Sequence, residues 1–77
     1  MKKVRDLANG TYFLYQEGVW RKIEDIFDNG KLHHTEVTLE LFKPDDNWLA
    51  STDDELHSMD SYCVVQPIKV VTTIVNI

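Results

Sequence analysis

Apolar and polar residues alternate most clearly between residues 31 and 42. The apolar residues there are Val37, Leu39 and Leu41, and they alternate with the polar residues Glu36, Thr38 and Glu40. Successive side chains of a strand point to opposite faces, so a period of two is typical of a strand that is buried on one side. The pattern predicts a strand from Lys31 to Phe42. A second strand is expected over Thr11–Gln16, because its aromatic residues favour a pleated surface.

The segment from Val19 to Phe27 allows two interpretations. As a strand it places Val19, Ile23 and Phe27 on one face, with Trp20 and Ile26 on the other. As an amphipathic helix from Trp20 to Phe27 it also fits a period of 3.6 residues. We favour the strand, because turn signals bracket the segment tightly.

Two dipeptides, Glu17-Gly18 and Asn29-Gly30, separate these three runs. Asn-Gly is the strongest short hairpin signal, since a type I′ turn needs positive φ at both central residues. The two dipeptides predict tight turns at 17–18 and 29–30, and therefore a three-stranded meander over residues 11–42. An earlier Asn9-Gly10 turn would end a lead-in segment, residues 1–10.

The second half of the chain predicts shorter elements. Pro44 should stop the third strand before a polar loop at 45–47, and Trp48–Ala50 is a candidate short strand. Thr52 and Glu55 have the spacing of a helix capping box, which predicts a helical turn near residues 53–59 with Leu56 and Met59 toward the core. Strong β segments are expected at 62–66 and 68–77, broken at Pro67. Proline cannot donate to a ladder, so this position should be a bend, a bulge or an exposed edge.

This order of elements predicts an all-β fold, a small SH3-like or Tudor-like barrel of five to six strands with one helical turn, as a single domain over 11–77. Gly18–Ile23, followed by Gly30 and Val37, resembles the glycine–tryptophan–basic start of Tudor-type barrels. Arg21–Phe27 together with 41–46 is similar in rhythm to the middle of bromo-adjacent homology domains, which are much longer. Each resemblance covers about a third of the chain or less. Both imply fold alone, and no functional residue is carried over.

The cysteine content and the hydropathy of the chain indicate the compartment in which we expect the protein. Cys63 is the one cysteine of 77 residues, which excludes an intramolecular disulfide and a zinc site of the usual spacing. It lies in an apolar run without a cationic neighbour, so we expect a small buried hydrophobe in a reducing compartment. The start lacks an apolar signal-peptide core, and no stretch approaches the ~20 apolar residues of a membrane helix. We expect a cytoplasmic chain without membrane contact.

The charge is unevenly distributed. The net charge is −5, yet three of the eight basic residues lie within the first five, so residues 6–77 carry a net charge of −8. Such a surface repels phosphates, and we expect no direct nucleic-acid binding. A protein partner with a basic surface is the expected ligand.

Aromatic and acidic residues supply the candidate site. An exposed aromatic cluster beside carboxylates would suit a peptide carrying Lys, Arg or a methylated ammonium group. The predicted binding residues are Tyr12, Trp20, Asp45, Asp46, Trp48, Asp53 and Asp54. We therefore predict a non-enzymatic binding module.

Two other functions remain open. The chain could be an acidic inhibitor, of the kind found among phage or mobile-element products, that blocks a basic nucleic-acid-binding site. It could also be a structural subunit that forms homo-oligomers by pairing the nearly uncharged 70–77 strand with a neighbour.

The sequence contains no residue pattern typical of an enzyme active site, a metal site or a cofactor site. Counted from Asp45, the acidic stretch has Ala50 and Leu56 at the positions where a calcium loop needs glycine and glutamate. His33 and His34 are adjacent in a predicted strand, so they should point to opposite faces and not chelate one ion. No base or third group is placed to activate Cys63. We expect no catalytic residues, no metal and no cofactor.

Overall fold

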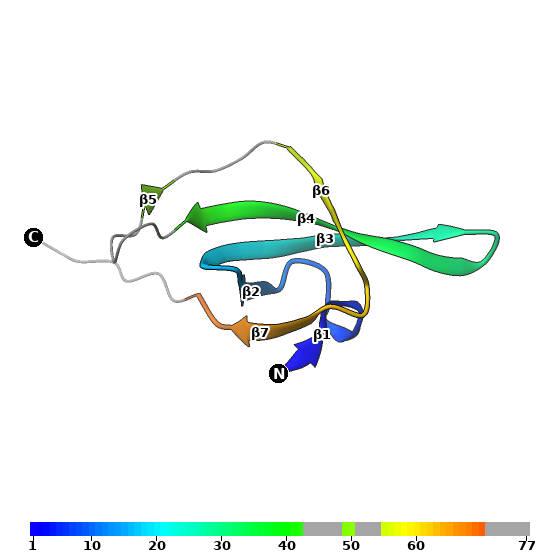
Figure 1. Ribbon diagram of the computed structural model, residues 1–77, viewed down its shortest axis with the longest axis horizontal. Coiled ribbons are helices and arrows are strands. Elements are labelled where there is room, and N and C mark those ends of the chain that lie inside the picture. Colours follow the sequence, from blue (N-terminus) through cyan, green and yellow to red (C-terminus); the bar gives the residue numbers. More distant parts are fainter. Residues whose placement is uncertain (43–48, 51–54, 71–77) are drawn as a thin grey trace, which may run out of the picture.

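The computed structural model describes residues 1–42, 49–50 and 55–70, and the fold is built almost entirely from strands (Figure 1). The strands are β1 (Lys2–Lys3), β2 (Tyr12–Tyr15), β3 (Gly18–Asp28), β4 (Lys31–Phe42), β5 (Leu49–Ala50), β6 (His57–Met59) and β7 (Val64–Ile68). A 3-10 helix, η1 (Val4–Asp6), follows β1. No helical segment within these residues has the length and hydropathy needed to cross a bilayer.

The strands form one antiparallel sheet in the order β1-β7-β2-β3-β4-β5, and β6 also pairs with β4. Figure 1 shows β6 running across β4 toward the start of β7. The all-β class and the β2–β3–β4 meander are confirmed, and β3 is a strand rather than a helix. The sheet ends at β1 and at β5, which do not pair with each other in the part of the chain described, so the expected barrel closure is not seen.

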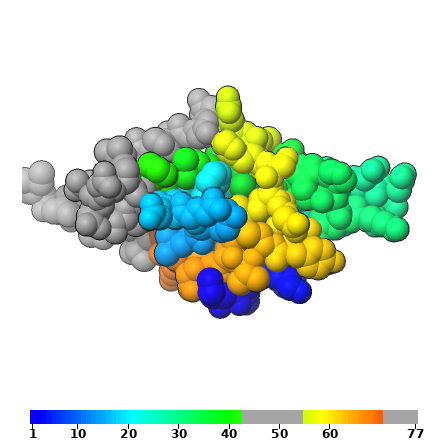
Figure 2. Space-filling model, in the orientation of Figure 1, coloured from blue at the N-terminus to red at the C-terminus, as the bar shows by residue number. Residues whose placement is uncertain are grey.

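The hairpin between β3 and β4 turns at Asn29 and Gly30, as predicted. Their φ values are 51° and 76°, the left-handed values that a type I′ turn requires. The two strands extend well beyond the rest of the sheet, and Figure 2 shows this hairpin arm (teal and green) projecting from one end of the molecule.

The other predicted turn is shifted by one residue. Tyr15 pairs with Gly18, so the central residues are Gln16 and Glu17, with φ values of 45° and 60°. Gly18 is needed for space instead, because a Cβ there would lie 3.0 Å from Leu39 Cδ1 and 3.0 Å from Trp20 Nε1. The glycine at position 18 is therefore required by close packing and not by a positive φ.

The predicted helical turn near 53–59 is wrong over His57–Met59, which is strand β6. Residues 51–54, where it would begin, lie outside the described residues. Val37 pairs with His57 and Thr35 with Met59, so the free edge of β4 supplies the partners that decide the conformation. A one-turn helix has little stability of its own to oppose this pairing.

The predicted break between two β segments at Pro67 is wrong, because β7 continues through it. The exposed edge expected there fits the pairing, since among the described residues β1 pairs with Val64 and Val65 of β7 only. Pro67 lies opposite Phe13 of β2, and β7 extends to Ile68. The polar loop at 45–47 and most of the expected 68–77 strand fall outside the described residues.

The core contains the first residues of the chain. Its buried apolar side chains are Val4, Leu7, Phe13, Val37, Met59 and Val65. Val4 N donates to Cys63 O at 2.9 Å and Arg5 N donates to Ser61 O at 3.0 Å. Part of the predicted lead-in at 1–10 is therefore bonded to the sheet and packed inside it.

Candidate functional site

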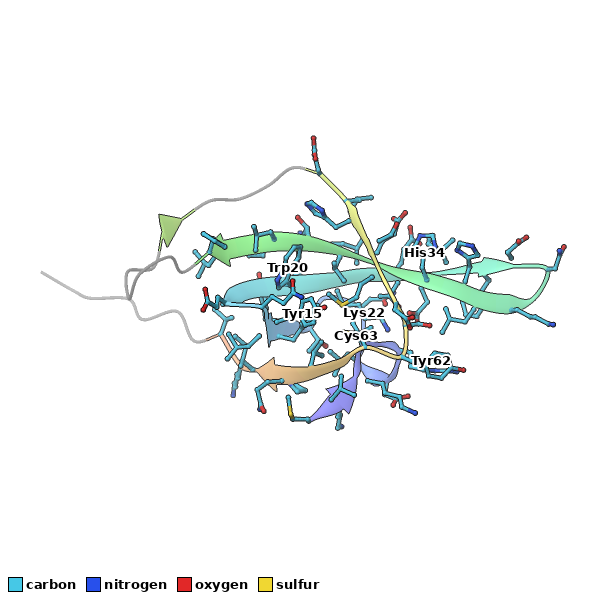
Figure 3. All side chains as sticks on the ribbon, viewed as in Figure 1. Tyr15, Trp20, Lys22, His34, Tyr62 and Cys63 are labelled. Carbon is cyan, nitrogen blue, oxygen red and sulfur yellow. The ribbon has the colours of Figure 1, made fainter. Side chains whose placement is uncertain are left out.

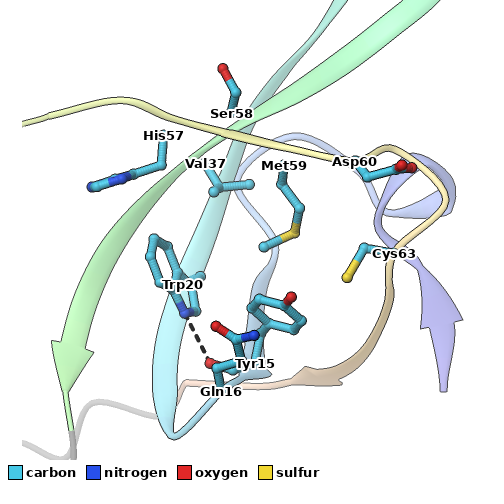
Figure 4. Close-up of a pocket in the computed structure, with 9 residues that line it drawn as sticks. All are labelled: Tyr15, Gln16, Trp20, Val37, His57, Ser58, Met59, Asp60 and Cys63. Atoms are coloured by element: carbon cyan, nitrogen blue, oxygen red, sulfur yellow. Dashed lines mark hydrogen bonds between the residues drawn. The ribbon is translucent and has the colours of Figure 1, made fainter.

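A pocket of about 280 Å³ opens on one face of the sheet, between β2, β3, β4 and β6 (Figure 4). Each of these strands contributes side chains, and the turns that follow β2 and β6 complete the wall. The lining residues are Tyr15, Gln16, Trp20, Val37, His57, Ser58, Met59, Asp60 and Cys63.

Two rings define one wall of the pocket. Trp20 Nε1 donates a 3.0 Å hydrogen bond to the carbonyl of Tyr15 (dashed in Figure 4), which fixes the indole across the turn. The His57 ring meets the indole edge to face, with centroids 5.4 Å apart and an interplanar angle of 88°. Since both rings are only half-buried, part of their surface remains open to a ligand.

The base of the pocket is apolar. Val37 is 1% exposed and Met59 is 9% exposed, and both belong to the core. They come together because β6 pairs with β4 through Val37–His57 and Thr35–Met59. The apolar base is therefore a product of strand pairing between segments about twenty residues apart.

Tyr15 and Cys63 meet on the opposite side of the pocket from His57 (Figure 4). A hydrogen bond between the Tyr15 side chain and the Cys63 side chain is the largest cause of a raised pKa at Tyr15, followed by their electrostatic interaction and by burial. A phenol of ordinary pKa is already neutral over the physiological range, and the raised pKa of Tyr15 favours the same form further. Tyr15 therefore offers a ligand a neutral ring and not a phenolate.

Asp60 is the one carboxylate among the nine lining residues, and none of the nine is a lysine or arginine. Its Oδ1 accepts a 2.8 Å hydrogen bond from Tyr62 N, and its carbonyl accepts one of 2.9 Å from Cys63 N. These bonds hold the turn after β6. The electrostatics of the pocket thus favour a cation.

Two of the seven predicted binding residues have described side chains, Tyr12 and Trp20, and of these two the structure brings Trp20 to this pocket. Phe13 pairs with Trp20 while Tyr12 pairs with Arg21, so Tyr12 and Trp20 lie on opposite faces of the sheet. The other five, Asp45, Asp46, Trp48, Asp53 and Asp54, fall outside the residues whose side chains are described.

Sequence reasoning missed the residues that complete the pocket. His57 and Met59 were assigned to a helix, and Tyr15 and Cys63 are 48 positions apart in the chain. The apolar Met59 was expected to face the core, which is correct, but its neighbours there depend on the pairing of β6 with β4.

The two adjacent histidines do not point to opposite faces. Ile26 pairs with His34 and Phe27 with Leu32, so His33 is the extra residue of a β-bulge. The bulge brings His33 Nδ1 to 2.6 Å from His34 Nδ1. No cluster of three or more metal-ligating His, Cys, Asp or Glu side chains occurs within residues 1–42 and 55–70.

Comparison of the chain with protein-family models, with curated proteins and with solved structures found no match. A function must therefore be argued from the pocket and its chemistry.

Proposed function

We propose that this protein is a non-enzymatic binding module for a protein partner, and that its pocket receives a lysine side chain of that partner, bare or methylated. The observation that carries the proposal is the composition of the pocket. Three rings and an apolar base surround it, and its lining contains one carboxylate, that of Asp60, and no lysine or arginine.

Each part of a lysine side chain has a counterpart in the lining. The aliphatic stem suits the apolar surface of Val37 and Met59. The ammonium group suits the faces of Trp20 and Tyr15, where a cation over an aromatic ring gains about 0.5–2 kcal/mol. A volume of about 280 Å³ is at the lower limit of ligand pockets, which suits one side chain.

The charge of the whole chain supports a basic partner. A net charge of −5 attracts a basic surface over a distance and speeds the encounter. The finer fold assignment, an SH3-like or Tudor-like barrel, belongs to the same proposal. The β2–β3–β4 meander and the register shifts in β3–β4 support it, because bulges bend a sheet toward closure.

The test is an NMR titration with two capped amino acids, trimethyl-lysine and norleucine, which share an aliphatic stem and differ in charge. The Met59 methyl, the Trp20 indole and the His57 ring report on the pocket. We expect saturable shifts of these three signals with trimethyl-lysine at millimolar concentration and much smaller shifts with norleucine. Equal responses to both compounds, or none at the pocket, would contradict the proposal.

Asp60→Asn is the matched variant. An asparagine side-chain oxygen can still accept the hydrogen bond from Tyr62 N, so the turn is kept and only the charge is lost. We expect binding of trimethyl-lysine to weaken about two- to fivefold, the scale of an exposed ion pair. Glu24→Gln removes one charge elsewhere and should leave binding unchanged. Equal losses in both variants would indicate a general charge effect and not recognition at the pocket.

A further inference from the structure

The hairpin arm carries a second cluster, separate from the pocket. His33 Nδ1 and His34 Nδ1 are 2.6 Å apart, and the two rings meet at 78° with centroids 4.9 Å apart. Figure 3 shows His34 near the base of the arm, apart from Tyr15, Trp20 and Cys63. His33 is exposed and His34 half-buried, so an ion in solution can reach the pair.

The contact requires a particular protonation. Two Nδ1 atoms at hydrogen-bond distance cannot both carry protons, so at least one presents a lone pair toward the other. A transition-metal ion binds imidazole nitrogens at about 2.0–2.1 Å, and two nitrogens on one ion are therefore about 3 Å apart. Opening the pair by less than an ångström, within the freedom of two side-chain torsions, would admit such an ion in place of the shared proton.

Acidic neighbours favour a cation at this position. His34 Nε2 lies 3.9 Å from Glu36 Oε1, and a carboxylate on that side favours the tautomer with the proton on Nε2 and the lone pair on Nδ1. Glu24 pairs with Glu36 across the hairpin, which places two carboxylates directly opposite each other. Like charges in this arrangement repel, and a nearby cation relieves the repulsion.

We propose that His33 and His34 form a two-imidazole binding site for a divalent transition-metal ion, with Nδ1 of each ring as ligand and water completing the coordination. Glu36 acts as a positioning residue for the His34 ring. The site is open, because no third metal-ligating side chain joins the pair within the described residues. It does not depend on the proposed lysine pocket, which shares none of these residues.

The test is calorimetry of the untagged protein with Zn²⁺, Ni²⁺ and Cu²⁺. We expect one ion per chain, with Cu²⁺ bound most tightly, as the general order of divalent ions predicts. His33→Asn and His34→Asn should each weaken binding at least about tenfold, and Glu36→Gln by a smaller factor. His57→Asn is the matched control, since it removes an imidazole outside the arm.

Loss of binding in both arm variants with His57→Asn unchanged would support the site. In NMR spectra the ion should then shift the His33 and His34 ring signals before any others. The proposal is overturned if no ion binds with a dissociation constant below about 1 mM. It is equally overturned if either arm variant keeps wild-type affinity, or if His57→Asn loses as much as they do.

Discussion

Lys22 bonds to Leu7 across fifteen positions of the chain, its buried Nζ donating a 2.7 Å hydrogen bond to the Leu7 carbonyl. The same ammonium group reaches the Arg5 carbonyl at 3.3 Å and Asp25 Oδ2 at 3.0 Å. Thr35 donates to the other carboxylate oxygen of Asp25 at 2.7 Å. The Lys22 side chain is 1% exposed. Through these bonds its buried ammonium group links η1 to β3.

Replacing Lys22 with Met should therefore destabilise the fold. The substitution keeps the aliphatic stem but leaves the Leu7 carbonyl and Asp25 without their charged donor, at a cost of roughly 2–4 kcal/mol. Chemical denaturation measures the loss. Lys31→Met, at an exposed lysine of β4, is the control and should change stability by less than about 0.5 kcal/mol. Similar values for the two variants would contradict the buried network.

Gly18→Ala should destabilise the protein and disturb the pocket together. The added Cβ would meet Leu39 Cδ1 and Trp20 Nε1 at 3.0 Å, and such overpacking costs about 1–3 kcal/mol. Because Trp20 must move, the indole N–H signal should shift. Gly30→Asn, at a turn position with φ of 76° and open space around it, should lose stability through backbone strain alone and leave the indole N–H signal in place. A neutral Gly18→Ala would mean that β3 and β4 do not approach here as described.

The turn at Gln16 and Glu17 offers a stabilising change. Both residues have left-handed φ values, 45° and 60°, which Asn and Gly adopt with less strain. The double replacement Gln16→Asn with Glu17→Gly should raise the free energy of unfolding by about 1 kcal/mol. Thermal unfolding measures the gain. If the turn were instead centred on 17–18, residue 16 would lie outside its central pair, and the single replacement Gln16→Asn would bring no gain.

The Tyr15–Cys63 interaction predicts a pH effect. The folded protein holds the phenolic proton more tightly than the unfolded chain, whose tyrosine pKa is near 10.0. This contribution to stability is complete below pH 10 and is lost as the pH rises through the raised pKa. With Tyr12 and Tyr62 replaced by Phe, absorbance at alkaline pH follows Tyr15 alone. Cys63→Ala should move its pKa down toward 10.0, and an unchanged titration would contradict the hydrogen bond.

Several elements were readable from local sequence. The alternation in Lys31–Phe42 and the Asn29-Gly30 turn specify β4 and its hairpin, because period-two burial and positive φ are properties of neighbouring residues. The residue pattern of β3 fits both a strand and a helix, and the turns on either side of it favour the strand. The turn at Gln16 was placed one residue late, since a glycine can serve a close contact as well as a turn.

The candidate site was predicted only in part. Trp20 was named, but several of its neighbours come from β6, and the capping-box sequence that precedes β6 favours a helix locally. Pairing with β4 outweighs that preference, because edge hydrogen bonds and the burial of Met59 stabilise the strand more than one helical turn gains. The contact between His33 and His34 was not predicted for a similar reason. Adjacent side chains share a face only at a bulge, and the bulge is visible only in the register of two strands.

The sequence by itself determined the all-β class, the meander of β2, β3 and β4, and the negative charge, because these depend on residue type and short-range periodicity. Tertiary structure decided the pocket, the burial of Lys22 and the meeting of His33 with His34. Each depends on which strands pair and in what register. That choice follows from burying apolar surface across the whole chain, and no short segment encodes it alone.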